Sequence, residues 1–146
     1  DNERAEHIRK QMLDPSCRVP LWQLVYHDSM IIFPYWGDST GNSKELLKHK
    51  ILFACLYGCA PLYSCSIKDF EELYNDIVLS YKKITEVHEK VAELPMTDFE
   101  VLSKDYKLQR SIFGDKYEVV ANFSDEDRFY NGNVVGANDY FFGALR

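Results

Sequence analysis

The sequence has no cluster of basic residues and no apolar run long enough to cross a bilayer. Its 146 residues carry 17 Lys and Arg against 23 Asp and Glu, for a net charge of −6. Proteins bind nucleic acid through clustered Lys and Arg that contact phosphates, so we do not expect a nucleic-acid partner. A transmembrane helix needs about 20 consecutive apolar residues, so we do not expect a membrane partner either. Internal repeats and low-complexity tracts are also missing.

Cysteine is scarce and does not follow a metal-binding pattern. The four residues are Cys17, Cys55, Cys59 and Cys65, and the last three are separated by three and five residues. These spacings match none of the common zinc motifs, so we predict no metal site and no cofactor. The last three lie in the apolar stretch "FACLYGCAPLYSC", which favours buried free thiols. Free thiols favour a cytoplasmic location, but a disulfide stays possible if the protein is exported, so the location is left open.

Aromatic residues are the one unusual total, at 14% with 10 Tyr and 9 Phe. A surplus of aromatic rings is typical of a large core, or of a surface that stacks against flat apolar faces such as sugar rings. The remaining totals, with 46% hydrophobic and 27% charged residues, are those of one globular domain of ordinary size.

The stretch "VPLWQLVYHDSMIIFPYWGDST" places two polar residues after an apolar run. Val19–Tyr26 is almost continuously apolar, which predicts a strand buried on both faces, as in a parallel sheet. His27 and Asp28 then follow at the end of that strand. The next loop carries Phe33, Pro34, Tyr35 and Trp36, which a purely structural role of the strand does not explain.

Two helices are predicted after this loop. Ser43 is a suitable N-cap for a helix over residues 44–57, with a buried second half and Gly58 as its left-handed stop. The run "APLYSCS" is a second candidate buried strand. Ser66 and Asp69 form a capping-box variant that starts a long helix ending before Pro95. Its predicted inward stripe consists of Phe70, Tyr74, Ile77, Tyr81, Ile84, His88 and Val91.

The period changes to two after Pro95. "KLQRSIF", "GD" and "KYEVVANF" predict a β-hairpin with a two-residue type I′ or II′ turn at Gly114-Asp115, and the tail offers one or two more short strands. Two strands and a few helices do not complete a parallel sheet. We therefore interpret residues 1–95 as the end of something larger, joined to an antiparallel β domain over residues 96–146.

Three segments resemble a family of enzymes. "VPLWQLVYHDSMIIFPYWGDST", "LFACLYGCAPLYSC" and "LQRSIFGDKYEVVANFSD" are similar to the C-terminal part of glycoside hydrolases related to endo-α-N-acetylgalactosaminidases and α-N-acetylgalactosaminidases. The resemblance implies a fold of the α/β plus all-β class, in which the last strands and helices of a (β/α)8 barrel precede a β-sandwich-type domain. It places "VPLWQLVYHD" at the seventh barrel strand and Phe70–Leu94 at the last barrel helix.

The resemblance also implies a substrate site. Chemistry in such barrels occurs at the C-terminal ends of the strands, where His27 and Asp28 would lie. There Asp28 would accept hydrogen bonds from sugar hydroxyls and His27 would donate or accept a further one, while Tyr35 and Trp36 would stack on the pyranose ring. Each has a structural alternative: His27 and Asp28 could hydrogen-bond a loop backbone, and both aromatics could belong to the core. Asp38 is better explained as a turn residue, and Tyr63 as core.

No catalytic residue is predicted within this chain. Glycoside hydrolysis needs two carboxylates that flank the scissile bond, and the resemblance places both on earlier barrel strands, upstream of Asp1. The predicted function is therefore a C-terminal portion of a hydrolase acting on an N-acetylhexosaminide, inactive alone, with a carbohydrate substrate and the upstream remainder of the barrel as partners. The alternative is a non-catalytic carbohydrate-binding or interaction domain that folds as it stands.

Overall fold

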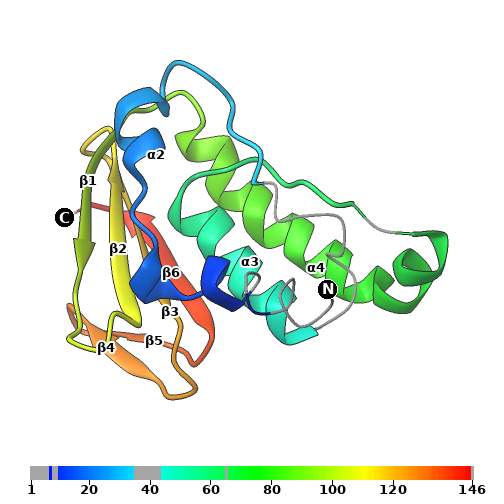
Figure 1. Cartoon of the computed structure of the whole chain (residues 1–146). Helices are drawn as coiled ribbons and strands as arrows, with labels where there is room; N and C mark the ends of the chain where they lie inside the picture. The colour runs from blue at the N-terminus through cyan, green and yellow to red at the C-terminus, as the bar shows by residue number, and fades with distance from the viewer. Residues whose placement is uncertain (1–6, 8–9, 35–43, 65, 146) are drawn as a thin grey trace.

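The computed structural model describes residues 7, 10–34, 44–64 and 66–145 (Figure 1). Helical elements come first and strands second, so the observed class is α+β with an antiparallel sheet. The elements in chain order are η1 (Pro15–Cys17), α2 (Leu21–Tyr26), α3 (Lys44–Leu56), α4 (Ile67–Val91), β1 (Met96–Val101), β2 (Leu108–Phe113), β3 (Tyr117–Asn122), β4 (Arg128–Tyr130), β5 (Asn133–Val135) and β6 (Asp139–Ala144).

The strands form a four-stranded antiparallel sheet in the order β1-β2-β3-β6 and a separate two-stranded sheet of β4 and β5. The predicted β2–β3 hairpin is confirmed. Gly114 and Asp115 have φ values of +56° and +51°, the signs that a type I′ turn requires at both central positions. The turn is closed by a hydrogen bond from Lys116 N to Phe113 O of 3.0 Å. The extra strands predicted in the tail are β5 and β6.

The two faces of the large sheet are covered by different elements (Figure 1). Val119, Ala121 and Phe123 face α3 and α4 in the main core, as the period-two pattern predicted. On the opposite face, Val120 joins a smaller cluster that the β4–β5 hairpin completes with Tyr130 and Val135. The sheet is therefore the middle layer between the helices and the hairpin.

Both long helices form where the sequence predicted them. The apolar second half of α3 is buried, with Leu52, Phe53 and Leu56 at 1% exposure or less. The predicted stripe of α4 is only half right, because Ile77, Ile84 and Val91 are buried whereas Phe70, Tyr74 and Tyr81 are exposed. The observed inward stripe, spaced alternately by four and three, consists of Leu73, Ile77, Ser80, Ile84, Val87 and Val91.

Two strand predictions are wrong. Residues 19–26 contain the helix α2 and have no strand partner, and α2 contains no buried residue. Its backbone groups are satisfied within the helix, for example from Leu24 N to Pro20 O at 2.9 Å, which an unpaired strand cannot achieve. The described part of "APLYSCS" forms no strand. It is an irregular segment that follows α3.

One core extends across Pro95. Phe53 and Leu56 of α3, Val91 of α4 and Phe113 of β2 all belong to the same cluster of buried side chains. The division into residues 1–95 and 96–146 stays a prediction. Any boundary drawn there passes through closely packed side chains. No helix in the described ranges is long and apolar enough to cross a membrane.

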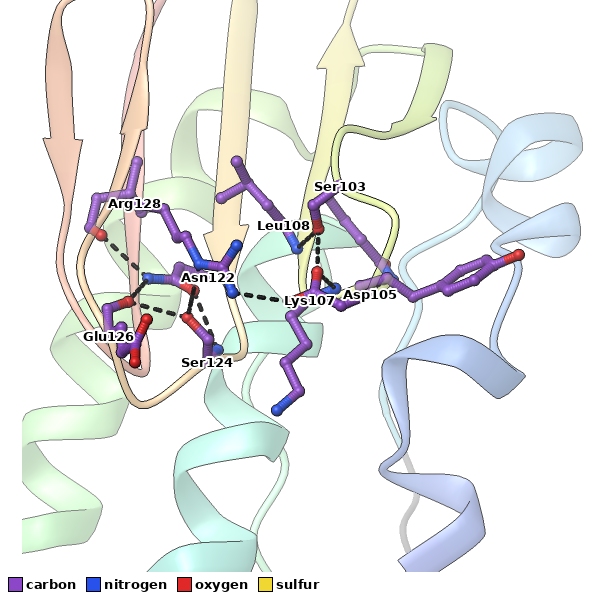
Figure 2. Close-up of polar contacts among 11 residues, drawn as sticks. Ser103, Asp105, Lys107, Leu108, Asn122, Ser124, Glu126 and Arg128 are labelled. Carbon is purple, nitrogen blue, oxygen red and sulfur yellow. Dashed lines mark hydrogen bonds and ion pairs between the residues drawn. The ribbon is translucent and has the colours of Figure 1, made fainter.

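A buried amide holds the connection between β3 and the β4–β5 hairpin (Figure 2). The side chain of Asn122, fully buried, donates from Nδ2 to the carbonyl oxygens of Glu126, Val135 and Gly136 at 2.8, 3.0 and 3.0 Å. Its Oδ1 accepts from the backbone N–H of Ser124 at 3.0 Å. This network fixes the path of residues 123–136 over the sheet.

The neighbouring loop between β1 and β2 is tied by Asp105 (Figure 2). Its carboxylate accepts a 2.5 Å hydrogen bond from Ser103 Oγ and one of 3.2 Å from Lys107 N, and it pairs with Arg128 at 2.7 Å. These contacts, the serine hydrogen bond first, lower the pKa of Asp105 from 3.8 to about 2.

We therefore expect the Asp105 carboxyl to titrate near pH 2 in a side-chain NMR titration. Because the folded-state pKa is depressed, the stabilisation is complete above the ordinary value near pH 4 and is lost as the pH falls towards 2. Ser103→Ala should raise the midpoint, because it removes the largest single contribution. An unchanged midpoint in Ser103→Ala would show that the serine hydroxyl does not bind the carboxylate.

Candidate functional site

His27 is the C-cap residue of α2 and lies in the interior, at 3% exposure. Its Nδ1 faces the carbonyl oxygen of Leu94 at 2.7 Å, and its Nε2 faces that of Gly58 at 3.3 Å. The ring also packs against Phe113, with centroids 4.9 Å apart. Both nitrogens are thus directed at main-chain carbonyls, which favours the structural of the two roles considered for this residue.

Asp28 points in the other direction. It is exposed, and its Oδ1 accepts a 3.0 Å hydrogen bond from Ser29 Oγ. The carboxylate is therefore turned to solvent, where it is available to accept hydrogen bonds from a polyhydroxylated ligand. Tyr35, Trp36 and Asp38 lie outside the described residues. Tyr63 bonds through its hydroxyl to Ser80 Oγ of α4 at 2.5 Å, which is a packing role.

The sequence reading missed the partners that hold His27. Gly58 was noted only as a helix stop, although its carbonyl oxygen also faces His88 Nδ1 of α4 at 3.0 Å. In the sequence, His88 fits the helix stripe in place of an apolar residue. The paired histidines gave no signal in the sequence, because 61 positions separate them and no spacing rule connects them.

The segment that carries Asp28 is held at both ends. His27 fixes its start, and at its end Ile32 O accepts a 3.0 Å hydrogen bond from Ala60 N. Both attachments are made to the chain that leaves α3, at Gly58 and Ala60. Residues 28–31 therefore form a short exposed bridge between two fixed points.

A separate hollow of about 410 Å³ lies between α3, α4 and the start of β6. Its lining is both apolar and polar, and it includes the ion pair of Lys83 Nζ with Asp139 Oδ1 at 2.8 Å. Asp28 does not line this hollow. The residues that do are Leu47, Lys48, Ile51, Leu52, Asp76, Leu79, Lys83, Ala137, Asn138 and Asp139.

The thiols of Cys55 and Cys59 are buried and unpaired with another cysteine, whereas Cys17 is exposed. Cys65 lies outside the described residues. Burial raises the pKa of Cys59 to about 12 and also raises that of Cys55. Within the part of the chain that the structure describes, no three His, Cys, Asp or Glu side chains are placed to hold a metal ion.

We therefore expect a thiol-alkylating reagent at pH 8 to modify Cys17 of the folded protein while leaving Cys55 and Cys59 unmodified. Only the thiolate reacts, and burial suppresses both its formation and its access to reagent. Peptide mass spectrometry before and after denaturation provides the measurement. Modification of Cys59 at the rate of Cys17 in the folded state would contradict the burial described here.

Comparison with known proteins gives the class. The model of a family described as glycosyl hydrolases related to the GH101 family, GH129, matches residues 2–112, well over half of the chain. The chain belongs to the GH129 glycoside hydrolases. The resemblance noted from the sequence is confirmed at this level. The match to GH129 also continues across Pro95, through β1 and into β2. No curated protein matches the chain.

Two solved structures of one enzyme resemble this GH129 chain. The ligand-free α-N-acetylgalactosaminidase NagBb from Bifidobacterium bifidum is 25% identical, with a TM-score of 0.51, over 82% of this chain and 17% of that chain. Its complex with GalNAc gives 24% identity and a TM-score of 0.50, over 83% and 18%. The chain therefore spans less than a fifth of the length of the enzyme that it resembles.

Proposed function

We propose that this chain is the C-terminal portion of a glycoside hydrolase that removes α-linked N-acetylgalactosamine or a similar N-acetylhexosamine. The observation that carries the proposal is the GH129 match over residues 2–112. The likeness to an α-N-acetylgalactosaminidase supports the choice of sugar. In this proposal residues 1–95 contribute helices to the end of a (β/α)8 barrel whose strands come from the rest of the enzyme, and residues 96–146 form the antiparallel domain packed against these helices.

The exposed apolar side chains before residue 34 support a partner that covers them. Leu21, Val25 and Ile31 are 68%, 63% and 61% exposed, which is unusual for aliphatic side chains in so short a stretch. We call this group the α2 surface; it consists of Val19, Leu21, Trp22, Val25, Ile31 and Phe33. The remainder of the barrel is the partner that we propose for it.

Asp28 is the sugar contact in this proposal, with Tyr35 and Trp36 as the stacking rings. Its exposed carboxylate supports that role, because a sugar needs acceptors for its hydroxyl hydrogens. His27 holds the bridge in place. The acid and the nucleophile are supplied by the rest of the enzyme, because hydrolysis needs a carboxylate pair across the scissile bond.

The test is Asp28→Asn in the complete enzyme, assayed with an aryl α-N-acetylgalactosaminide. We expect kcat/KM to fall by about 100-fold, which corresponds to loss of about 2.7 kcal/mol of binding to the transition state. Glu89→Gln, which removes an exposed carboxylate of α4, is the control and should leave kcat/KM unchanged. An unchanged kcat/KM in Asp28→Asn would remove the sugar-contact role.

The isolated chain separates this function from that of an independent binding domain. With the α2 surface uncovered, we expect it to bind a hydrophobic dye and to hydrolyse no substrate. Replacing Leu21 and Val25 together by serine should reduce dye binding. In the complete enzyme the same change should lower the melting temperature. A soluble monomer that ignores the dye and binds N-acetylgalactosamine by calorimetry would favour the binding-domain alternative.

A further inference from the structure

The main-chain carbonyl of Gly58 lies against two imidazole rings from different helices. His88 Nδ1 lies 3.0 Å away on the α4 side, and His27 Nε2 lies 3.3 Å away on the α2 side. His27 is fully interior and His88 is half-buried. We call these three residues the Gly58 clamp.

The clamp leaves no space for a side chain at residue 58. Gly58 has φ of +65°, and a Cβ placed on it would overlap His27 Nε2 and lie 2.9 Å from atoms of Phe113 and Val91. The two imidazoles thus lie against the backbone itself. The direction in which the chain leaves α3 is therefore set by contacts from α2, α4 and β2 together.

The direction in which the chain leaves α3 determines the position of the bridge of residues 28–31. The bridge follows directly after His27, a member of the clamp. At its other end, Ile32 is bonded to Ala60, two residues after Gly58. Among the described residues no hydrogen bond joins His88 to Asp28 or to the bridge, yet His88 Nδ1 lies 3.0 Å from the carbonyl oxygen next to which the bridge is attached. A shift of Gly58 moves both attachment points at once.

We propose that His88 and Gly58 are positioning residues for Asp28: through the clamp they set the orientation in which Asp28 meets the sugar. This inference rests on the proposed function, because it presumes that Asp28 contacts substrate. His88 contributes a fixed N–H donor at Nδ1. An asparagine at residue 88 places a donor at the same distance from the backbone, whereas an alanine places none.

The test is a double-mutant cycle in the complete enzyme, assayed with an aryl α-N-acetylgalactosaminide. His88→Ala should raise KM about tenfold with little change in kcat, since a misplaced binding group weakens ground-state and transition-state binding alike. His88→Asn should restore most of the loss. In an Asp28→Asn background, His88→Ala should cost nothing further, because the group that it positions is gone.

Ser80→Ala is the matched control. Ser80 is a buried polar residue of the same helix, eight positions before His88, and its hydroxyl bonds to Ile77 O at 2.8 Å and to the Tyr63 hydroxyl at 2.5 Å. Any effect of Ser80→Ala on kcat/KM should be the same factor with and without Asp28→Asn. If His88→Ala does not fold, His88→Gln, whose donor lies one bond further out, takes its place in the cycle.

The outcomes separate the two proposals. A tenfold loss in His88→Ala that persists unchanged in the Asp28→Asn background overturns the positioning role but leaves the sugar contact intact. If His88→Ala has normal kinetics while Asp28→Asn is impaired, the positioning role is likewise overturned and the sugar contact is kept. An Asp28→Asn enzyme with normal kinetics overturns the sugar contact and the positioning role together.

Discussion

Replacing Gly58 by alanine is expected to lower the free energy of unfolding by about 3 kcal/mol. A non-glycine residue at a φ of +65° costs about 1 kcal/mol, and forcing a methyl group into a filled site costs about 2 kcal/mol more. The methyl group would overlap the His27 ring and crowd Phe113 and Val91, which belong to three different elements. Because these neighbours are themselves buried, the space cannot be made by turning one side chain away.

Gly132→Ala is the matched control for this substitution. Gly132 has φ of +80°, but a Cβ there would meet nothing within 4 Å. It should therefore show only the backbone cost of about 1 kcal/mol. Denaturant unfolding of wild type and both variants gives the comparison. Equal losses in the two variants would mean that the surroundings of Gly58 yield easily, contrary to the packing described above.

Replacing Asn122 by aspartate is expected to cost about 4 kcal/mol at pH 7, although the two side chains have the same shape. The amide nitrogen of Asn122 donates to three carbonyl oxygens, and a carboxylate oxygen in its place would face all three as an acceptor. An uncompensated buried charge costs about 3–5 kcal/mol. Asn122→Ala should cost less, about 2 kcal/mol, because it leaves carbonyls unsatisfied without adding charge.

The order of the two Asn122 variants is the decisive measurement. If size alone mattered, alanine would be the worse replacement. Chemical denaturation at pH 7 distinguishes these cases, with Asn131→Asp as the control at an exposed turn position, where a change within about 0.5 kcal/mol is expected. An Asn122→Asp protein as stable as wild type would mean that the amide does not bind the three carbonyls.

The parts of the fold that could be predicted from the sequence are those that depend on neighbouring residues. The β2–β3 hairpin follows from Gly114-Asp115 between two alternating runs, and α3 follows from its apolar half and Gly58. These signals are local, so they hold wherever the segment lies in the molecule.

The parts that failed depend on what the segment packs against. Residues 19–26 are almost continuously apolar, and both a buried strand and a short apolar helix can have that composition. In α4 the predicted stripe runs through Phe70, Tyr74 and Tyr81, but tyrosine carries a hydroxyl that suits an exposed position, and Leu73 and Val87 are the buried residues. The structure instead buries the stripe that fits α3, at a position rotated around the helix.

The candidate site also contains residues with a local sequence signal and contacts that only the folded chain creates. The position of Asp28 after an apolar run makes it a candidate, and the structure shows that it is exposed; its contact with a sugar stays a prediction. The carbonyls of Gly58 and Leu94 that hold His27 were out of reach, because any residue carries a carbonyl and only the folded chain brings it near a particular ring. The grouping of Asp28 with Tyr35 and Trp36 stays a prediction.

The core that extends across Pro95 has a consequence for how such proteins can diverge. Phe113 of the sheet touches His27 and lies next to Gly58, so strands and helices share side chains that must change in concert. A chimera made by exchanging everything after Pro95 with the equivalent segment of a distant homologue would inherit mismatched halves of one interior. We therefore expect recombination at Pro95 to be disfavoured, so that the segments before and after Pro95 are inherited together.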